Sequence, residues 1–280
     1  MPGDDTTASI PYGPPVSLPT AIRQRQWRLD TQSYLLAVIG LRAASRCQWD
    51  TVKHHLMRLE QLSSLSGQTT LDLFVKYLTG VYLQGTGDLL GALSIYQDSA
   101  FNLPENPAAT YTARCEFAIL AALNRLWIMQ HPNCRNDEET LQLIEDLRPL
   151  CTHHPHINLR STWHAVMAAL VTDPPQSLGH RKQNMASVNG GTRVTNNVFL
   201  SAVCLCLMRH YFFEDVLGPQ SVKSARAAAM QAQRSGNVLW ESVADAMLAQ
   251  TYETEGLRDE ARAEHQKAMD KAAAAFARSS

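Results

Sequence analysis

The stretch from Gly80 to Pro104 constrains the fold of this chain more than any other, because its small and aromatic residues follow a fixed spacing. Gly80 and Ala92 leave room for two antiparallel helices to approach closely, and Gly87 between them suits a tight turn. Tyr96 is placed to fill the gap toward the next helix pair, and Pro104 to end the second helix. This spacing is typical of a tetratricopeptide-type helical hairpin.

A second copy of this spacing lies near the end of the sequence, and segments with helical apolar periodicity fill the chain between the two copies. No run of alternating β-branched residues competes with this pattern. We therefore predict an all-α protein, a tetratricopeptide-like superhelix of about twelve antiparallel helices in six pairs. The second copy consists of Leu248, Ala249, Tyr252, Gly256, Ala261 and Ala268.

The composition of the chain divides it into two parts. Residues 1–16 are rich in proline and glycine and lack periodic apolar residues, so we expect a disordered lead-in there. The superhelix is predicted over residues 17–280. Within it, residues 179–197 are predicted to be irregular, because they hold few apolar residues and a Gly190–Gly191 pair. The first helix presents apolar residues with no repeat before it, which predicts self-association of the isolated chain; these are Ile22, Leu29, Leu36 and Ile39.

Charge and apolar content argue against several classes of protein. The chain has 280 residues and a formal net charge of −1, which gives no reason to expect a general phosphate-binding surface. Its longest apolar run, from Val198 to Met208, is too short to span a bilayer, and no secretory signal opens the chain. The six cysteines have no framework spacing, which is typical of reduced thiols in a cytosolic or nuclear protein.

Candidate chemical motifs in the sequence are weak. The glycines between Gly85 and Gly91 lack the spacing of a phosphate-binding loop and follow a helix, so a repeat turn is favoured. The cluster from Cys151 to His156 could supply metal ligands, but a solvated turn is favoured because no second ligand pair exists at zinc spacing. We therefore expect no catalytic residue, no metal site, no cofactor and no small-molecule substrate. Four tryptophans are expected to pack in the core: Trp27, Trp127, Trp163 and Trp240.

Four segments resemble the fungal branch of the cohesin loading factor family: residues 18–32, 122–132, 143–155 and 224–253. The resemblance covers about residues 17–280 and corresponds to the C-terminal half of a family member. It implies a tetratricopeptide-like superhelix without catalytic activity, acting in the nucleus in sister-chromatid cohesion. It also implies a groove that wraps the extended N-terminal segment of the large HEAT-repeat subunit of the loader. Chromatin would be reached indirectly, through that heterodimer.

Two other classes of function stay open at this point. A generic tetratricopeptide adaptor is the main alternative, although an adaptor for chaperone tails would need Lys and Asn where this chain has Tyr77 and Val81. An enzyme is disfavoured because no catalytic motif is present. Direct DNA binding is also disfavoured, since Arg23, Arg25 and Arg28 make only a thin basic stripe.

The repeat register predicts which residues would contact an extended partner chain. In a superhelix of this type the first helix of each pair lines the concave wall. Mixed aromatic and amide side chains on that wall would suit an extended chain, whose backbone needs hydrogen-bond partners. An alternative for Phe74 and Tyr77 is that they pack against the neighbouring helix pair. The predicted concave residues are Tyr34, Phe74, Tyr77, Val81, Gln84, Val243, Ala246, Gln250 and Glu253.

Overall fold

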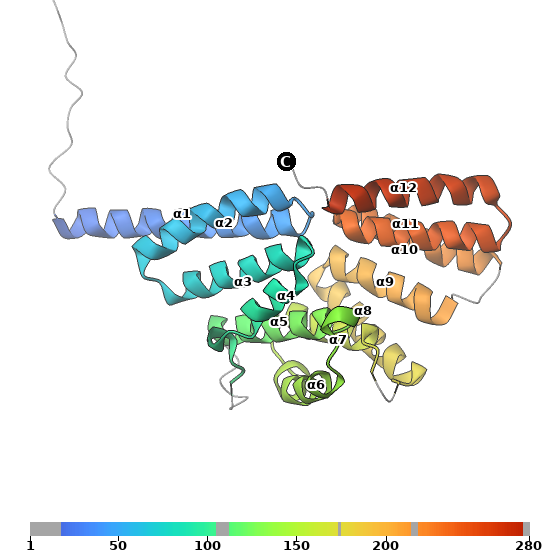
Figure 1. Ribbon diagram of the computed structural model, residues 1–280, viewed down its shortest axis with the longest axis horizontal. Helices are drawn as coiled ribbons and strands as arrows, with labels where there is room; N and C mark the ends of the chain where they lie inside the picture. Colours follow the sequence, from blue (N-terminus) through green and yellow to red (C-terminus); the bar gives the residue numbers. More distant parts are fainter. Residues whose placement is uncertain (1–17, 105–111, 173–174, 214–217, 277–280) are drawn as a thin grey trace, which may run out of the picture.

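The computed structural model describes residues 18–104, 112–172, 175–213 and 218–276. Within these ranges it contains twelve α-helices and no β-strand, which confirms the predicted all-α repeat fold (Figure 1). In chain order the helices are α1 (Leu18–Ala44), α2 (Trp49–Ser66), α3 (Thr69–Gly85), α4 (Leu89–Tyr96), α5 (Ala113–Ile128), α6 (Asp137–Cys151), α7 (Ile157–Ala169), α8 (Leu178–Thr195), α9 (Val198–Phe213), α10 (Pro219–Ser235), α11 (Val238–Thr254) and α12 (Arg258–Phe276).

The helices form six antiparallel pairs that stack into a curved array (Figure 1). Each odd-numbered helix packs on the next odd-numbered helix, from α1 on α3 through to α9 on α11. Even-numbered helices pack on the odd helices before and after them, and within the described ranges no two even-numbered helices make a comparable contact. When the helices of one row contact one another and the helices of the other row do not, the stack must curve toward the row that makes the contacts. The odd-numbered helices therefore lie on the inner side of the curve, and we call their row the inner wall.

The Gly80 hairpin shows why the predicted spacing produces this pairing. A Cβ atom on Gly80 would lie 2.6 Å from Cε1 of Tyr96, so only glycine permits α3 and α4 to approach this closely. Tyr96 also belongs to a buried cluster with Ala121 and Ile128 of α5, as the predicted role in contacting the next pair requires. Gly87 takes the left-handed backbone conformation, with φ of 88°. Cys47 takes the same conformation at the equivalent turn between α1 and α2, with φ of 58°.

The second helix of this hairpin is shorter than the sequence predicts. It ends at Tyr96, well before Pro104, and a 3₁₀ turn follows over Ser99–Phe101. Asp98 ends the α-helical path because its side chain accepts a hydrogen bond from the Ala100 backbone N–H and caps that turn.

The prediction of an irregular segment over residues 179–197 is wrong, because α8 occupies Leu178–Thr195. Ser177 caps this helix by accepting a hydrogen bond from the His180 backbone N–H. The side of α8 that faces the core is largely polar, which removes the apolar periodicity that would have revealed it. Gly191 fits against α7, since a Cβ atom there would lie 2.0 Å from the Ser161 hydroxyl oxygen. The buried residues of α8 are Arg181, Asn184, Met185, Val188 and Thr192.

The two ends of the described array meet, so the curve closes on itself (Figure 1). Trp49 Nε1, at the start of α2, donates a hydrogen bond of 2.9 Å to the carbonyl oxygen of Ala275 in the last turn of α12. Asn237, which caps α11, donates through Nδ2 to the Ser45 carbonyl oxygen at 2.8 Å. Val238 and Leu239 pack against the apolar cluster of α1, α2 and α3. We call this contact between the α1–α2 corner and the ends of α11 and α12 the clasp.

Candidate functional site

The predicted site residues on α3 divide by their position along the helix. Phe74 is buried, and its ring centroid lies 6.1 Å from that of Phe117 on α5. The Tyr77 ring lies 5.6 Å from the same Phe117, and the Tyr77 hydroxyl oxygen accepts a hydrogen bond of 3.1 Å from Asn124. Burial raises the pKa of Tyr77, which keeps its hydroxyl protonated. Both aromatic side chains therefore join α3 to α5, which is the packing role that the sequence left open.

Val81 and Gln84 lie further along α3 and are half-buried. Val81 packs against the cluster that also receives Val238 and Leu239 from α11. Gln84 Oε1 accepts a hydrogen bond of 3.4 Å from the Tyr96 hydroxyl. This part of the inner wall therefore contacts the chain's own helices, including those that form the clasp.

The remaining predicted residues lie on α11 and α1. On α11, Val243 is half-buried, whereas Ala246, Gln250 and Glu253 are exposed at positions three to four residues apart. This spacing places the three exposed side chains on one face of the helix. Tyr34 lies apart from them on α1 and is 69% exposed. The structure thus groups the predicted residues into a packed set on α3, an exposed set on α11 and a single exposed residue on α1.

Three aromatic residues bridge the array from different helices. The Trp240 ring of α11 lies 6.4 Å from the Trp127 ring of α5 and 6.4 Å from the Phe199 ring of α9. Trp127 is 40% exposed, so this bridge borders solvent. Among the four tryptophans expected in the core, Trp163 is buried as predicted. The prediction is wrong for Trp127, which borders solvent, and for Trp27, which is 66% exposed because no described helix covers that side of α1.

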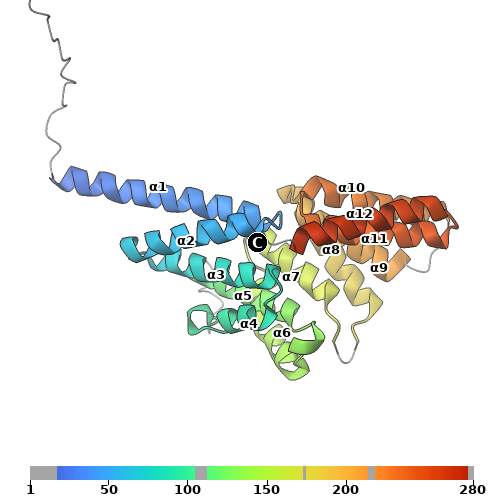
Figure 2. The same ribbon diagram turned by 45° about the horizontal axis from the view of Figure 1, so that its top comes forward.

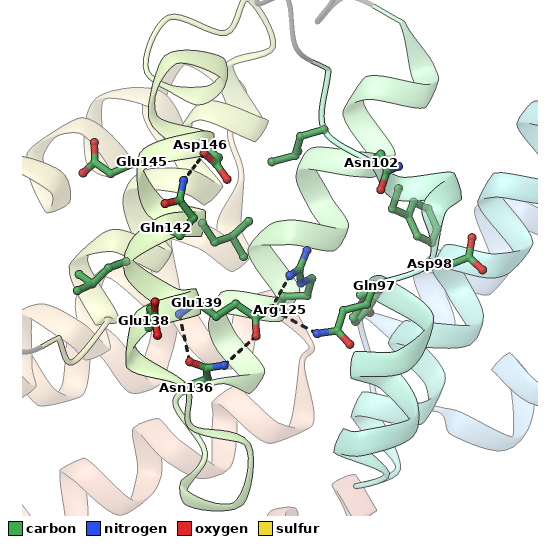
Figure 3. Close-up of a pocket in the computed structure, with 15 residues that line it drawn as sticks. Gln97, Asp98, Asn102, Arg125, Asn136, Glu138, Glu139, Gln142, Glu145 and Asp146 are labelled. Atoms are coloured by element: carbon green, nitrogen blue, oxygen red, sulfur yellow. Dashed lines mark hydrogen bonds and ion pairs between the residues drawn. The ribbon is translucent and has the colours of Figure 1, made fainter.

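A polar cleft of about 770 Å³ separates the α4 end of the second pair from α6 (Figure 3). Glu139 organises its centre: Arg125 forms an ion pair with Glu139 at 2.5 Å, and Gln97 donates to the same carboxylate at 3.3 Å. Asn136 caps α6 and donates through Nδ2 to Glu139. Sequence reasoning missed this cleft. The sequence signal that could have indicated the cleft is the acidic run at residues 137–139. The opposite wall of the cleft could not be read from the sequence, because only the fold brings it next to α6.

The cysteines and histidines that could carry chemistry are buried or paired within the fold. Burial raises the pKa of Cys151 to about 12, of Cys204 to about 11 and of Cys206 to about 12. Thiols with such pKa values stay protonated near neutral pH and are poor nucleophiles. In the suspected metal-ligand cluster, His154 is buried and His156 pairs instead with Glu116 at 2.7 Å.

The described residues contain neither a cluster of metal ligands nor a helix that could span a membrane. No three His, Cys, Asp or Glu side chains converge within the described ranges at a point that could hold a metal ion. None of the helices that the structure describes is both long and apolar enough to cross a bilayer.

The stacked pairs, the inner wall and the exposed face of α11 define a tetratricopeptide-like helical-repeat protein. Residues 4–259 match the family model described as Cohesin loading factor, and the chain therefore belongs to that family. Membership gives the protein a role in cohesin loading, which is a nuclear process on chromatin. No curated protein and no solved structure matches the chain.

Proposed function

We propose that this protein is a non-catalytic scaffold subunit of the cohesin loading complex. Its inner wall would bind the extended N-terminal segment of the large HEAT-repeat subunit, and the heterodimer would bring it to chromatin in support of sister-chromatid cohesion. The observation that carries this proposal is the exposed face of α11. There, Ala246, Gln250 and Glu253 lie open on a helix whose opposite face is buried.

The chemistry of this face suits an extended chain. A polypeptide without secondary structure of its own brings unpaired backbone N–H and C=O groups to its binding surface. The Gln250 amide can both donate and accept a hydrogen bond, and the Glu253 carboxylate accepts from N–H groups. Ala246, about one turn before Gln250, leaves space for a partner side chain beside them. The α11 face therefore offers two polar side chains and, at Ala246, a small apolar surface beside them.

The test is the affinity of the protein for the N-terminal segment of the large subunit, measured by isothermal titration. Changing Gln250→Ala together with Glu253→Ala should weaken binding by about tenfold, which corresponds to ~1.4 kcal/mol. The thermal midpoint should stay unchanged, because both side chains are exposed. A matched control changes one Glu and one Gln on α12, Glu260→Ala with Gln266→Ala. Unchanged affinity in the α11 variant would remove this face from the binding surface.

A further inference from the structure

The clasp and the three bridging aromatic residues close the concave side of the array. Helix α5 belongs to the third pair and α11 to the last, yet the Trp127 and Trp240 rings lie 6.4 Å apart, so the two helices meet across the curve. Figures 1 and 2 both show the end of α12 beside the corner between α1 and α2. The inner wall therefore contacts itself at this end of the helices.

This closure covers part of the surface that is proposed to bind the partner. Val81, a predicted contact residue on α3, is half-buried in the apolar cluster that also receives Val238 and Leu239 from the start of α11. Trp240 is half-buried as well, against Trp127. The exposed face further along α11 is open. A partner segment can thus reach that face, but it cannot reach Val81 while the clasp is closed.

The hydrogen bonds of the clasp lie at helix ends. Trp49 is the first residue of α2, and its acceptor Ala275 lies in the last turn of α12. Asn237, which donates to the Ser45 carbonyl oxygen, is the cap of α11. Helix ends open locally at a lower free-energy cost than helix centres. The clasp can therefore open while the helix pairs on either side of it stay folded.

The last pair is held together independently of the clasp. Lys271 of α12 forms ion pairs with Glu241 at 3.0 Å and Asp245 at 2.8 Å, both on α11. The Ser242 hydroxyl donates a hydrogen bond of 2.8 Å to the Ala268 carbonyl oxygen. None of these contacts involves the α1–α2 corner. Helices α11 and α12 would therefore move as one body when the clasp opens.

We propose that the clasp is an autoinhibitory contact that must open before the inner wall can bind its full length of partner chain. This inference rests on the proposed function, in which the partner is the extended N-terminal segment of the large HEAT-repeat subunit. A closed form that cannot bind lowers the apparent affinity by the fraction of molecules that are open. The segment binds the open form, so it would in turn hold the clasp open.

The experiment locks the clasp with a disulfide bond. Cys47 Sγ lies 3.9 Å from Asn237 Oδ1, so oxidation of Asn237→Cys should lock the clasp and reduction should release it. Fluorescence anisotropy with the labelled N-terminal segment should show affinity at least about tenfold weaker for the oxidised form than for the reduced form of the same variant. The parent protein, treated with the same oxidant, should bind as it does when reduced. Segment added before the oxidant should slow the cross-linking.

A second variant weakens the clasp instead of locking it. Trp49→Phe keeps an aromatic ring but removes the N–H that bonds to Ala275, and it should tighten binding by about twofold to tenfold. Trp163→Phe, the same change at a buried tryptophan of α7, should leave the affinity unchanged. Binding by Trp49→Phe that is no tighter than that of the parent would count against the autoinhibition.

The locked variant separates this inference from the function on which it rests. Equal affinities of its oxidised and reduced forms would overturn the autoinhibition and leave the proposed function intact. Cross-linking at the same rate with and without the segment would also overturn it. If neither the parent nor the reduced variant binds the segment, the proposed function itself is contradicted, and the autoinhibition is overturned with it.

Discussion

At the scale of single residues, the fold depends on close approaches that tolerate no added atom. Gly80→Leu should cost ~2 kcal/mol or more of unfolding free energy, because even its Cβ atom would lie 2.6 Å from the Tyr96 ring. Gly190 provides the matched contrast, since a Cβ atom built there meets nothing within 4 Å. Gly190→Ala should therefore stabilise α8 by ~0.5–1 kcal/mol through its higher helix propensity. Urea denaturation midpoints measure both changes, and equal midpoints for the two variants would contradict the tight contact.

Tyr77 is a second residue whose role the structure makes testable. Its ring packs on Phe117 and its hydroxyl accepts from Asn124, so Tyr77→Ala should destabilise the fold by about 3–5 kcal/mol. Tyr34→Ala should change stability by less than ~0.5 kcal/mol, because Tyr34 is exposed on α1. Thermal unfolding of the two variants provides the comparison. A stable Tyr77→Ala protein would mean that this side chain does not hold α3 to α5.

At the scale of helices, α8 depends on a buried arginine. Arg181 donates to the carbonyl oxygens of Ala168 and Leu170, which the end of α7 leaves without helical partners, and its guanidinium lies 4.1 Å from the Tyr211 ring centroid. Arg181→Met should destabilise the protein by about 1–3 kcal/mol, because two buried carbonyl groups lose their donors. Lys182→Met, at the exposed neighbouring position, should have little effect. Hydrogen exchange across α8 checks this, and equal protection in both variants would contradict it.

The helices also show how far sequence reasoning reaches. The Gly80 spacing predicts the pairing because both the small residues and the turn glycine are local features of the sequence. Helix α8 escapes prediction because Arg181 and Asn184 occupy core-facing positions, and their partners on α7 are set by the tertiary fold. Trp27 is misjudged for the converse reason. It is apolar and periodic, but burial requires a covering helix, and none that the structure describes lies there.

At the scale of the whole molecule, the clasp is the feature that local pattern could not predict, since it depends on curvature accumulated over every pair. An engineered disulfide bond can hold the two sides of the clasp together. The Cys47 sulfur lies 3.9 Å from Asn237 Oδ1, so Asn237→Cys should form a disulfide with Cys47 on mild oxidation. The bond should raise the unfolding free energy by about 2–4 kcal/mol relative to the reduced variant.

A matched control for the clasp places the new cysteine at Leu257, beyond the opposite end of α11 and roughly 25 Å from its start. Leu257→Cys should not cross-link to Cys47 under the same conditions. Peptide mapping by mass spectrometry identifies the bond. If Asn237→Cys cross-links only after partial denaturation, the ends of the array do not meet in the native protein.

The most direct test of the central claim is photo-crosslinking from the exposed face of α11 within the assembled loader heterodimer. A photoreactive amino acid at position 250 should cross-link to the N-terminal segment of the large HEAT-repeat subunit, because Gln250 is proposed to face that segment. The same amino acid at position 266 on α12 should give no such product. If the heterodimer forms but position 250 cross-links to no part of that segment, the proposed binding mode along the inner wall is contradicted.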